Sequence, residues 1–336
     1  METLRNVDLS FYAKNATKPI LIATHENPDG DAIGSLVGLG LYLHYLWGAH
    51  KNNQPIILYS PDYIPDNLQF ITEGMTIYSE YSLEELKKHE YAATILVNAR
   101  GPDRCRLPSP EAIRWGDHII IDHHLDDHPW AGFLLHDSEE VSSTCALIVE
   151  QLLQHFIPSK KIAQALLLGI TTDSLNFSIA TQTDHIAAGA CIHQGASPQV
   201  IRDNLAVENY EDLLYLSKAI EENTAFFYNK RVVISWIDVP TVASYIGSRL
   251  VGMLRNIQGV EIAVAISQGE PVDVDADVDG PYKLRFEFRS KIRNVRDLAV
   301  MLGGGGHERA AGASGEGWGH EAAVRVLDLI CPIYEI

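Results

Sequence analysis

Short, uninterrupted apolar runs constrain the first half of this chain more than any other feature. The runs are PILIAT (19–24), PIILY (55–59), ATILVN (93–98) and HIIID (118–122), and a helical pattern lies between the first two, over about 31–47. Continuous hydrophobicity is typical of strands covered on both faces, and strands that alternate with helices form parallel sheets. We therefore predict an α/β domain with a parallel sheet, which would bind its ligands at the carboxyl ends of the strands.

The second half reads as a smaller unit of the same class. After a helical pattern at about 208–227 come the strand RVVISWIDV, a helix (242–257), two strands (260–267 and 282–289), a helix (294–302), a glycine run and a last helix (319–330). A chain of 336 residues is long enough for two domains. We predict an α/β domain over 1–190, a helical linker over 191–230, a smaller α/β domain over 231–336, and a cleft between the two domains.

The distribution of charge limits the partners. A net charge of −18 excludes a protein that coats long duplex nucleic acid, because such binding needs a basic face. Residues 281–310 nevertheless hold seven Lys or Arg and three Asp or Glu, which suits a small anionic ligand. The start METLRNVDLS has no signal-peptide pattern, no stretch approaches a membrane span, and the four cysteines form no C-x-x-C pair. We expect a cytoplasmic protein without a membrane partner.

Imidazoles and carboxylates gather after several predicted elements. The first strand runs into HENPDGD, the strand HIIID ends in Asp122-His123-His124, and the apolar run KIAQALLL is followed by GITTDS. Hard divalent cations prefer such oxygen ligands together with imidazole, so two metal ions could be held. The five predicted ligands are His25, Asp29, Asp31, His123 and Asp173. The alternative for the first cluster is structural, with Asp31 as a helix N-cap and His25 as an isolated polar residue.

The order of these motifs resembles a known family. HENPDGDAIGS, ILVNAR, IDHH and GITTDS resemble motifs I to IV of the DHH phosphoesterase superfamily, while FRS (288–290) and GGGGHERAAG (303–312) resemble its DHHA1 domain. The similarity covers nearly the whole chain. It points to the short stand-alone branch of bifunctional oligoribonucleases and pAp phosphatases, rather than to the family II pyrophosphatases.

The resemblance implies a hydrolase with two Mn²⁺ ions, for which Mg²⁺ is a substitute. It makes the five residues above metal ligands, gives Asp122 a supporting role in catalysis and places His124 near the substrate phosphate. Two ions flanking a phosphate would activate a shared water for in-line attack.

One position departs from the family pattern. Where the family has an aspartate that bridges both metals, this chain has Asn98, which would have to act as a metal ligand through its amide oxygen. An amide carries no charge and offers one good oxygen donor. Either the second ion binds more weakly here, or Asn98 is a substitution in an otherwise active enzyme.

The second domain is expected to bind the substrate. The glycine run allows close approach of the backbone to an anion, and Arg289 can hold a phosphate with two parallel hydrogen bonds. The predicted substrate-binding residues are Arg289, Ser290, Gly304, Gly305, Gly306 and His307. Other basic residues of this region, such as Arg285, are interpreted as a solvated face.

Two functions from different classes follow. The first is a Mn²⁺-dependent phosphoesterase and exonuclease that converts short oligonucleotides, linear dinucleotides or pAp to mononucleotides. The second is a nucleotide-binding or sensing protein whose turnover is impaired by Asn98. A dinucleotide-dependent oxidoreductase is disfavoured, because no G-x-G-x-x-G follows the first strand. Whether the protein forms a homodimer stays open.

Overall fold

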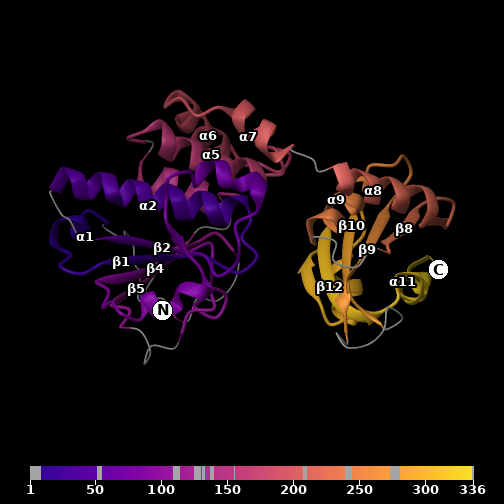
Figure 1. Ribbon diagram of the computed structural model, residues 1–336. Helices are drawn as coiled ribbons and strands as arrows, with labels where there is room; N and C mark the ends of the chain where they lie inside the picture. Colours follow the sequence, from indigo (N-terminus) through magenta and orange to yellow (C-terminus); the bar gives the residue numbers. More distant parts are fainter. Residues whose placement is uncertain are drawn as a thin grey trace. The chain divides into compact units, whose positions relative to one another are not determined.

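The computed structural model describes two compact units, Met1–Val207 and Glu208–Ile336 (Figure 1). The described residues are 9–50, 55–108, 114–124, 130, 133–136, 140–154, 156–206, 210–238, 244–272 and 281–334. The acidic stretch 273–280 lies outside them.

The first unit is built on the predicted parallel sheet. Its six strands lie in the order β3-β2-β1-β4-β5-β6, and every pair of neighbours is parallel. The four predicted strands are confirmed and the sheet gains one strand at each edge. The bounds are β1 Ile20–Ala23, β2 Ile56–Tyr59, β3 Ile77–Tyr78, β4 Ala93–Val97, β5 Asp117–Asp122 and β6 Phe133–His136.

Hydrophobic cores cover both faces of this sheet, which explains the continuous apolar runs. Ile22 and Ile95 belong to the core beneath the helices, whereas their neighbours Leu21 and Leu96 belong to a second core on the opposite face. Every residue of the central strands β1 and β4 is therefore removed from water, whichever way it points.

Helix α2 packs on the sheet against β1, β2 and β4, and α5 packs closely against α2 (Figure 1). A Cβ atom on Gly34 of α2 would lie 2.6 Å from the Ala165 carbonyl oxygen of α5, so the approach requires glycine. By length and composition, Gly30–Ala49 could cross a membrane, but 61% of that stretch is buried within the protein, as in a core helix. The helices are α1 Leu9–Asn15, α2 Gly30–His50, α3 Leu83–Leu86, α4 Thr144–Leu147, α5 Lys160–Asp173, α6 Gln182–His193 and α7 Pro198–Leu205, with 3-10 turns at Asp66–Ile71 and Glu80–Ser82 and a π-helical turn at Ile148–Leu152.

The second unit is a mixed sheet with helices on both faces. Its order is β11-β12-β10-β9-β8-β7, in which β8 and β9 are parallel and the other pairs antiparallel. Helices α8 and α9 bury one face of the sheet, while α10 and α11 bury the other. The elements are α8 Tyr210–Glu222, β7 Thr224–Phe227, β8 Val232–Ile237, α9 Ser244–Arg255, β9 Ile262–Pro271, β10 Tyr282–Ser290, α10 Arg296–Met301, β11 Gly305–His307, β12 Ala310–Gly317 and α11 Gly319–Tyr334.

Two details of the second unit correct the sequence-based expectation. The helix predicted over 208–227 ends at Glu222, and residues 224–227 form β7, because the Thr224 hydroxyl donates to the Ala219 carbonyl and the segment then pairs with β8. The last two glycines of the run, Gly305 and Gly306, belong to strand β11, which pairs with β12, and neither strand was predicted. A strand of small residues such as AAGASGEG has no apolar alternation to reveal it.

Candidate metal centre

The loop that follows β1 brings three predicted ligands toward the start of α2. Asp29 caps this helix, since its Oδ1 accepts hydrogen bonds from the backbone N–H groups of Asp31 (3.1 Å) and Ala32 (2.9 Å). The structural alternative had given the capping role to Asp31. With Asp29 as the cap, Asp31 lies inside the helix and its carboxylate is free to serve elsewhere.

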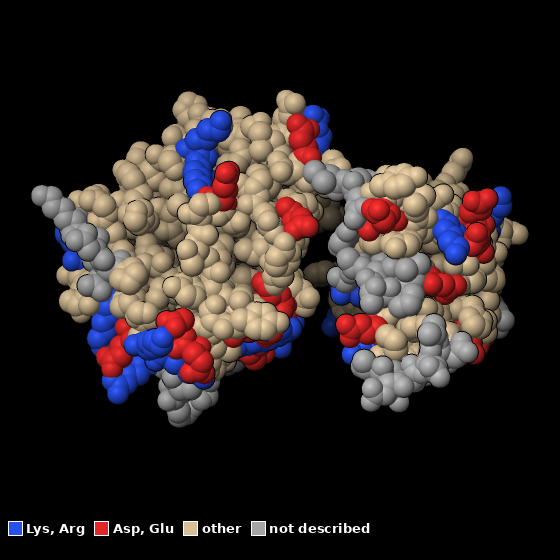
Figure 2. Space-filling view, in the orientation of Figure 1, with Lys and Arg blue, Asp and Glu red and all other residues tan. Residues whose placement is uncertain are grey.

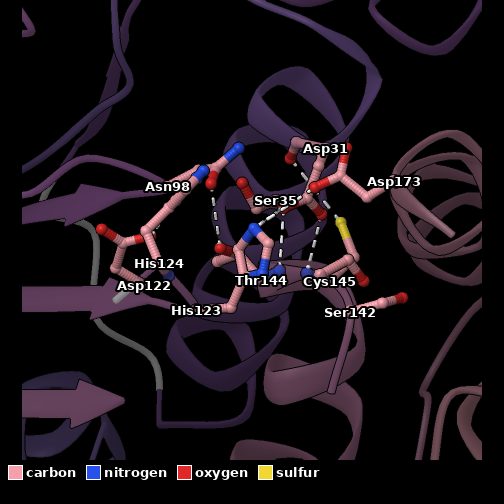
Figure 3. A network of polar contacts seen from close by, with 12 residues as sticks. Asp31, Ser35, Asn98, Asp122, His123, His124, Ser142, Thr144, Cys145 and Asp173 are labelled. Atoms are coloured by element: carbon pink, nitrogen blue, oxygen red, sulfur yellow. Dashed lines mark hydrogen bonds and ion pairs between the residues drawn. The ribbon is translucent and has the colours of Figure 1, made fainter. Parts of the chain in front are cut away.

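Asp31 is fully buried and is held by the start of another helix. Its two carboxylate oxygens accept hydrogen bonds from the backbone N–H groups of Thr144 (2.8 Å) and Cys145 (2.9 Å), in the first turn of α4 (Figure 3). Burial raises the pKa of Asp31, and the charge of Asp29 raises it further, while His123 lowers it. A positive charge placed here would therefore stabilise the ionised form.

His123, from the end of β5, points at two carboxylates (Figure 3). Its Nε2 lies 3.3 Å from Asp173 Oδ2 and 3.9 Å from Asp31 Oδ2. Asp173, the last residue of α5, has a pKa well above the usual value, because it is buried and lies near Asp31 and Asp29. One donor atom from each of Asp31, His123 and Asp173 lies within 4.8 Å of the others.

These three residues fit a divalent cation. His123 Nε2 is buried and makes no hydrogen bond among the described residues. The carboxylates of Asp173 and Asp31 lie beside it, so the three side chains could bind one cation together. Asp31 is fully buried and its charge raises the pKa of the partly buried Asp173, so the two carboxylates are costly without a cation between them. An imidazole nitrogen with two carboxylate oxygens is a donor set suited to Mn²⁺, Zn²⁺ or Mg²⁺.

His25 and Asp29 lie on the adjoining loop but outside this close group of three, which is the one such group among the described residues. The His25 Nδ1–H donates to the Glu26 carbonyl oxygen at 2.7 Å, and because a carbonyl only accepts, the Nε2 of His25 keeps its lone pair. His25 is therefore prepared as a ligand through Nε2.

The loop between His25 and Asp29 is clamped by an arginine that the sequence analysis missed. Arg106 contacts Glu26 (Nε to Oε2, 2.9 Å), Asp62 (Nη1 to Oδ1, 2.8 Å) and Glu80 (Nη1 to Oε2, 3.3 Å). Asp62 also accepts from the Asn27 backbone N–H at 2.7 Å, where the chain has φ of +50°. The one sequence signal for Arg106 is its basic neighbourhood, RCR, shortly after a predicted strand end.

Asn98 follows β4 and lies within the same network (Figure 3). Its side chain is buried, with Oδ1 accepting from the Thr144 hydroxyl at 3.3 Å and Nδ2 without a partner among the described residues. The backbone has φ of +54°, a region that asparagine tolerates better than most residues. Asn98 thus contributes a dipole rather than a charge beside the carboxylates.

Asp122 and His124 form a hydrogen-bonded pair. The Nδ1–H of His124 donates to Asp122 Oδ1 at 2.8 Å, and the His124 backbone N–H donates to the same oxygen at 3.3 Å. Burial opposes ionisation of Asp122, but the contacts with His124 outweigh it and lower the pKa of Asp122; the same bond raises the pKa of His124. Nε2 is the ring nitrogen of His124 that takes no part in this pair.

The predicted substrate residues of the second unit have unequal surroundings. Arg289 is partly buried on β10, and His307 is exposed on β11. Ser290 is fully buried, and its hydroxyl accepts from the backbone N–H groups of Ile292 (3.2 Å) and Arg293 (2.7 Å), which gives it a role in the turn.

The glycines of the run serve the strand pairing. A Cβ on Gly304 would collide with the Gly312 carbonyl oxygen, and one on Gly306, with φ of +130°, would lie 2.7 Å from Ala311 Cα. Gly305 has open space around its Cα hydrogens, with nothing within 4 Å of a built Cβ. The run therefore has a structural reason, and its predicted contact with an anion stays a prediction.

Charged side chains are mixed on the surface. Figure 2 shows, on the face in view, Lys and Arg side chains interspersed with Asp and Glu rather than gathered into a continuous basic surface. On this face the two signs are neighbours within each unit.

Comparison with known proteins gives matches over both units. Residues 19–170 match the N-terminal domain of the DHH family, and residues 229–331 match the DHHA1 domain. The chain is 27% identical to the bifunctional oligoribonuclease and PAP phosphatase NrnA of Thermus thermophilus, over 93% of this chain and 89% of that protein. It is also 27% identical to the Bacillus subtilis protein of the same name, over 94% and 96% of the two chains.

A solved structure has the same fold. An exopolyphosphatase-related protein from Bacteroides fragilis superposes with a TM-score of 0.76 at 19% identity, covering 97% of this chain and 94% of that one.

Proposed function

From the premise that the chain belongs to the DHH family and carries a DHHA1 domain, we propose that it is a metal-dependent phosphoesterase that converts short oligonucleotides, linear dinucleotides or pAp to mononucleotides. The relatives named oligoribonuclease and PAP phosphatase support this substrate class. The observation that carries the proposal is the close group of Asp31, His123 and Asp173, in which the imidazole nitrogen lies beside both carboxylates but makes no hydrogen bond among the described residues.

Each residue of the site has a distinct task in this proposal. Asp31, His123 and Asp173 hold a divalent cation, for which Mn²⁺ is proposed, and His25 and Asp29 with the Asn98 amide oxygen hold a second one more weakly. A bound divalent cation polarises a phosphoryl oxygen and lowers the pKa of water. His124, oriented by Asp122 through Nδ1, presents Nε2 to the phosphate, where it donates a hydrogen bond or passes a proton to the leaving oxygen.

The second unit would bind the substrate phosphate through Arg289, together with His307 and the glycines of the β11–β12 hairpin. We also propose that the protein is cytoplasmic and that it forms a homodimer. Light scattering on the purified protein measures the oligomeric state.

The test is release of mononucleotide from pAp and from a 5′-phosphorylated dinucleotide with Mn²⁺, for the wild type and for Asn98→Asp. We expect turnover in both and higher turnover in the variant, because an added carboxylate strengthens the second ion. Asn204→Asp on α7 adds the same charge away from the site and is expected to leave turnover unchanged. No release by either the wild type or Asn98→Asp would reject the enzyme.

The second candidate function rests on the Asn98 amide, which supplies no charge to the centre. If the chain is a nucleotide-binding or sensing protein, the wild type should bind nucleotide without turnover, and Asn98→Asp should create activity. The same two proteins thus separate the candidates.

A further inference from the structure

Thr144 contacts the candidate metal centre through both its backbone and its side chain. Its backbone N–H donates to Asp31 Oδ2 at 2.8 Å, and its hydroxyl donates to Asn98 Oδ1 at 3.3 Å (Figure 3). Thr144 is fully buried, so water does not compete for either hydrogen bond. One residue of α4 therefore joins a carboxylate of α2 to the amide that follows β4.

The first turn of α4 holds Thr144 in place. The Ser143 side chain caps the helix, since its Oγ accepts from the Ala146 backbone N–H at 3.0 Å, and the Cys145 backbone N–H donates to the other oxygen of Asp31 at 2.9 Å. Helix α4 also packs against α2, α5 and β5. The Thr144 hydroxyl thus reaches Asn98 from a turn that several elements fix.

The Asn98 side chain depends on this hydroxyl for its orientation. Asn98 is 2% exposed, and the Thr144 hydroxyl is the one hydrogen-bond partner of its amide among the residues that the structure describes, because Nδ2 has none. The two ends of an amide have almost the same shape, but only the oxygen can bind a cation. A carboxylate has two equivalent oxygens and needs no such selection, so the hydroxyl matters because residue 98 is asparagine.

We propose that Thr144 is a positioning residue, whose hydroxyl fixes the orientation in which the Asn98 amide oxygen binds a divalent cation. This role rests on the proposed function, in which that oxygen is a metal ligand. An amide oxygen has two lone pairs, so one can accept from the Thr144 hydroxyl while the other binds the cation. Loss of a partner that orients a ligand typically lowers metal affinity about 10- to 100-fold.

The experiment measures Mn²⁺ binding to the full chain by calorimetry, for the wild type, Thr144→Val and Thr144→Ser. Valine removes the hydroxyl but keeps the backbone N–H that holds Asp31. We expect Thr144→Val to bind at least one Mn²⁺ roughly 10- to 100-fold more weakly. Thr144→Ser restores the hydroxyl and should recover most of that affinity. An Mn²⁺ affinity of Thr144→Val equal to that of the wild type, or equal to that of Thr144→Ser, would overturn the proposal.

Thr94→Val is the matched control. Thr94 lies in β4, is fully buried, and donates through its hydroxyl to the Trp115 carbonyl oxygen at 2.8 Å. Each valine variant loses one buried hydroxyl hydrogen bond, so the melting temperature in EDTA should fall in both. Thr94→Val should nevertheless bind Mn²⁺ as the wild type does. An equal loss of Mn²⁺ affinity in the two variants would trace the effect to general destabilisation and contradict a positioning role. If Thr144→Val does not fold, Thr144→Ala removes the same hydroxyl.

A second background tests whether Thr144 acts through Asn98. Asn98→Gly removes the amide, and glycine suits the φ of +54° at this position. In this background Thr144→Val should leave the Mn²⁺ affinity unchanged, because the hydroxyl has no amide left to orient. The same loss of affinity in both backgrounds would mean that Thr144 acts on the centre without Asn98, which rejects the proposed route.

These measurements are independent of turnover. A loss of Mn²⁺ affinity in Thr144→Val, in a protein that hydrolyses none of the substrates, would reject the proposed function and retain the role of Thr144. Hydrolysis of pAp by the wild type, together with unchanged Mn²⁺ affinity in Thr144→Val, would retain the function and reject that role.

Discussion

Replacement of Gly169 by alanine should damage the metal centre without replacing any predicted ligand. Gly169 lies in α5, and a Cβ there would overlap Cys145 Sγ and lie 2.6 Å from Asp31 Oδ1. The added methyl group must push the Asp31 carboxylate away from the two backbone N–H groups that hold it. The perturbation therefore reaches Asp31 from a neighbouring helix.

The magnitude follows from three terms. Overpacking a well-packed site costs about 1–3 kcal/mol, and weakening one hydrogen bond to a charged group costs about 1.5–3 kcal/mol. Alanine in place of glycine inside a helix returns about 1 kcal/mol. The net loss in the free energy of unfolding is about 1.5–5 kcal/mol, and the affinity for Mn²⁺ should fall with it because Asp31 is displaced.

Gly189 provides the matched control. It lies inside α6 with no atom within 4 Å of a built Cβ, so Gly189→Ala should gain stability by up to about 1 kcal/mol. Urea unfolding of the two variants measures the free energies, and calorimetry with Mn²⁺ measures the affinity. If Gly169→Ala is as stable as Gly189→Ala and binds Mn²⁺ like the wild type, the close packing of α5 against Asp31 is wrong.

Three further predictions concern other parts of the chain. Asp173→Asn removes a repelling charge, so in EDTA the free energy of unfolding should rise by about 1 kcal/mol and the melting temperature with it. The variant should lose the stabilisation by Mn²⁺ that is expected for the wild type. Stabilisation by Mn²⁺ equal to that of the wild type would show that Asp173 is not a metal ligand. Arg106→Gln should loosen the loop that carries Glu26 and weaken Mn²⁺ binding severalfold at little cost in stability, since these ion pairs are partly exposed; unchanged affinity in calorimetry would dismiss the clamp. Gly306→Ala should destabilise the protein by about 1–3 kcal/mol in thermal unfolding, whereas Gly305→Ala should be nearly neutral. Equal effects of the two substitutions would refute the requirement for a positive φ at Gly306.

The local pattern of the chain was sufficient for the four central strands of the first sheet and for the chemical type of the candidate site, but not for the edge strands β3 and β6. The strand ILIA within PILIAT is apolar at every position, as a strand covered on both faces requires, and polar residues directly after parallel strands must meet at one edge. His123 and Asp31 were predictable as partners for that reason. Strands without apolar alternation, such as β12, left no comparable signal in the sequence.

The contacts that complete the site depend on packing between distant segments. Asp31 is 113 residues from Thr144, and its carboxylate is held by backbone N–H groups, which every residue has and no motif marks. Arg106 acquires its role from the side chains that the fold brings beside it, because electrostatic and hydrogen-bond energies depend on distances in space and not on separation along the chain. Residue types and strand ends can be predicted from the sequence alone. The partners of the Asp31 carboxylate and of the Arg106 guanidinium exist only after distant segments of the chain have packed together.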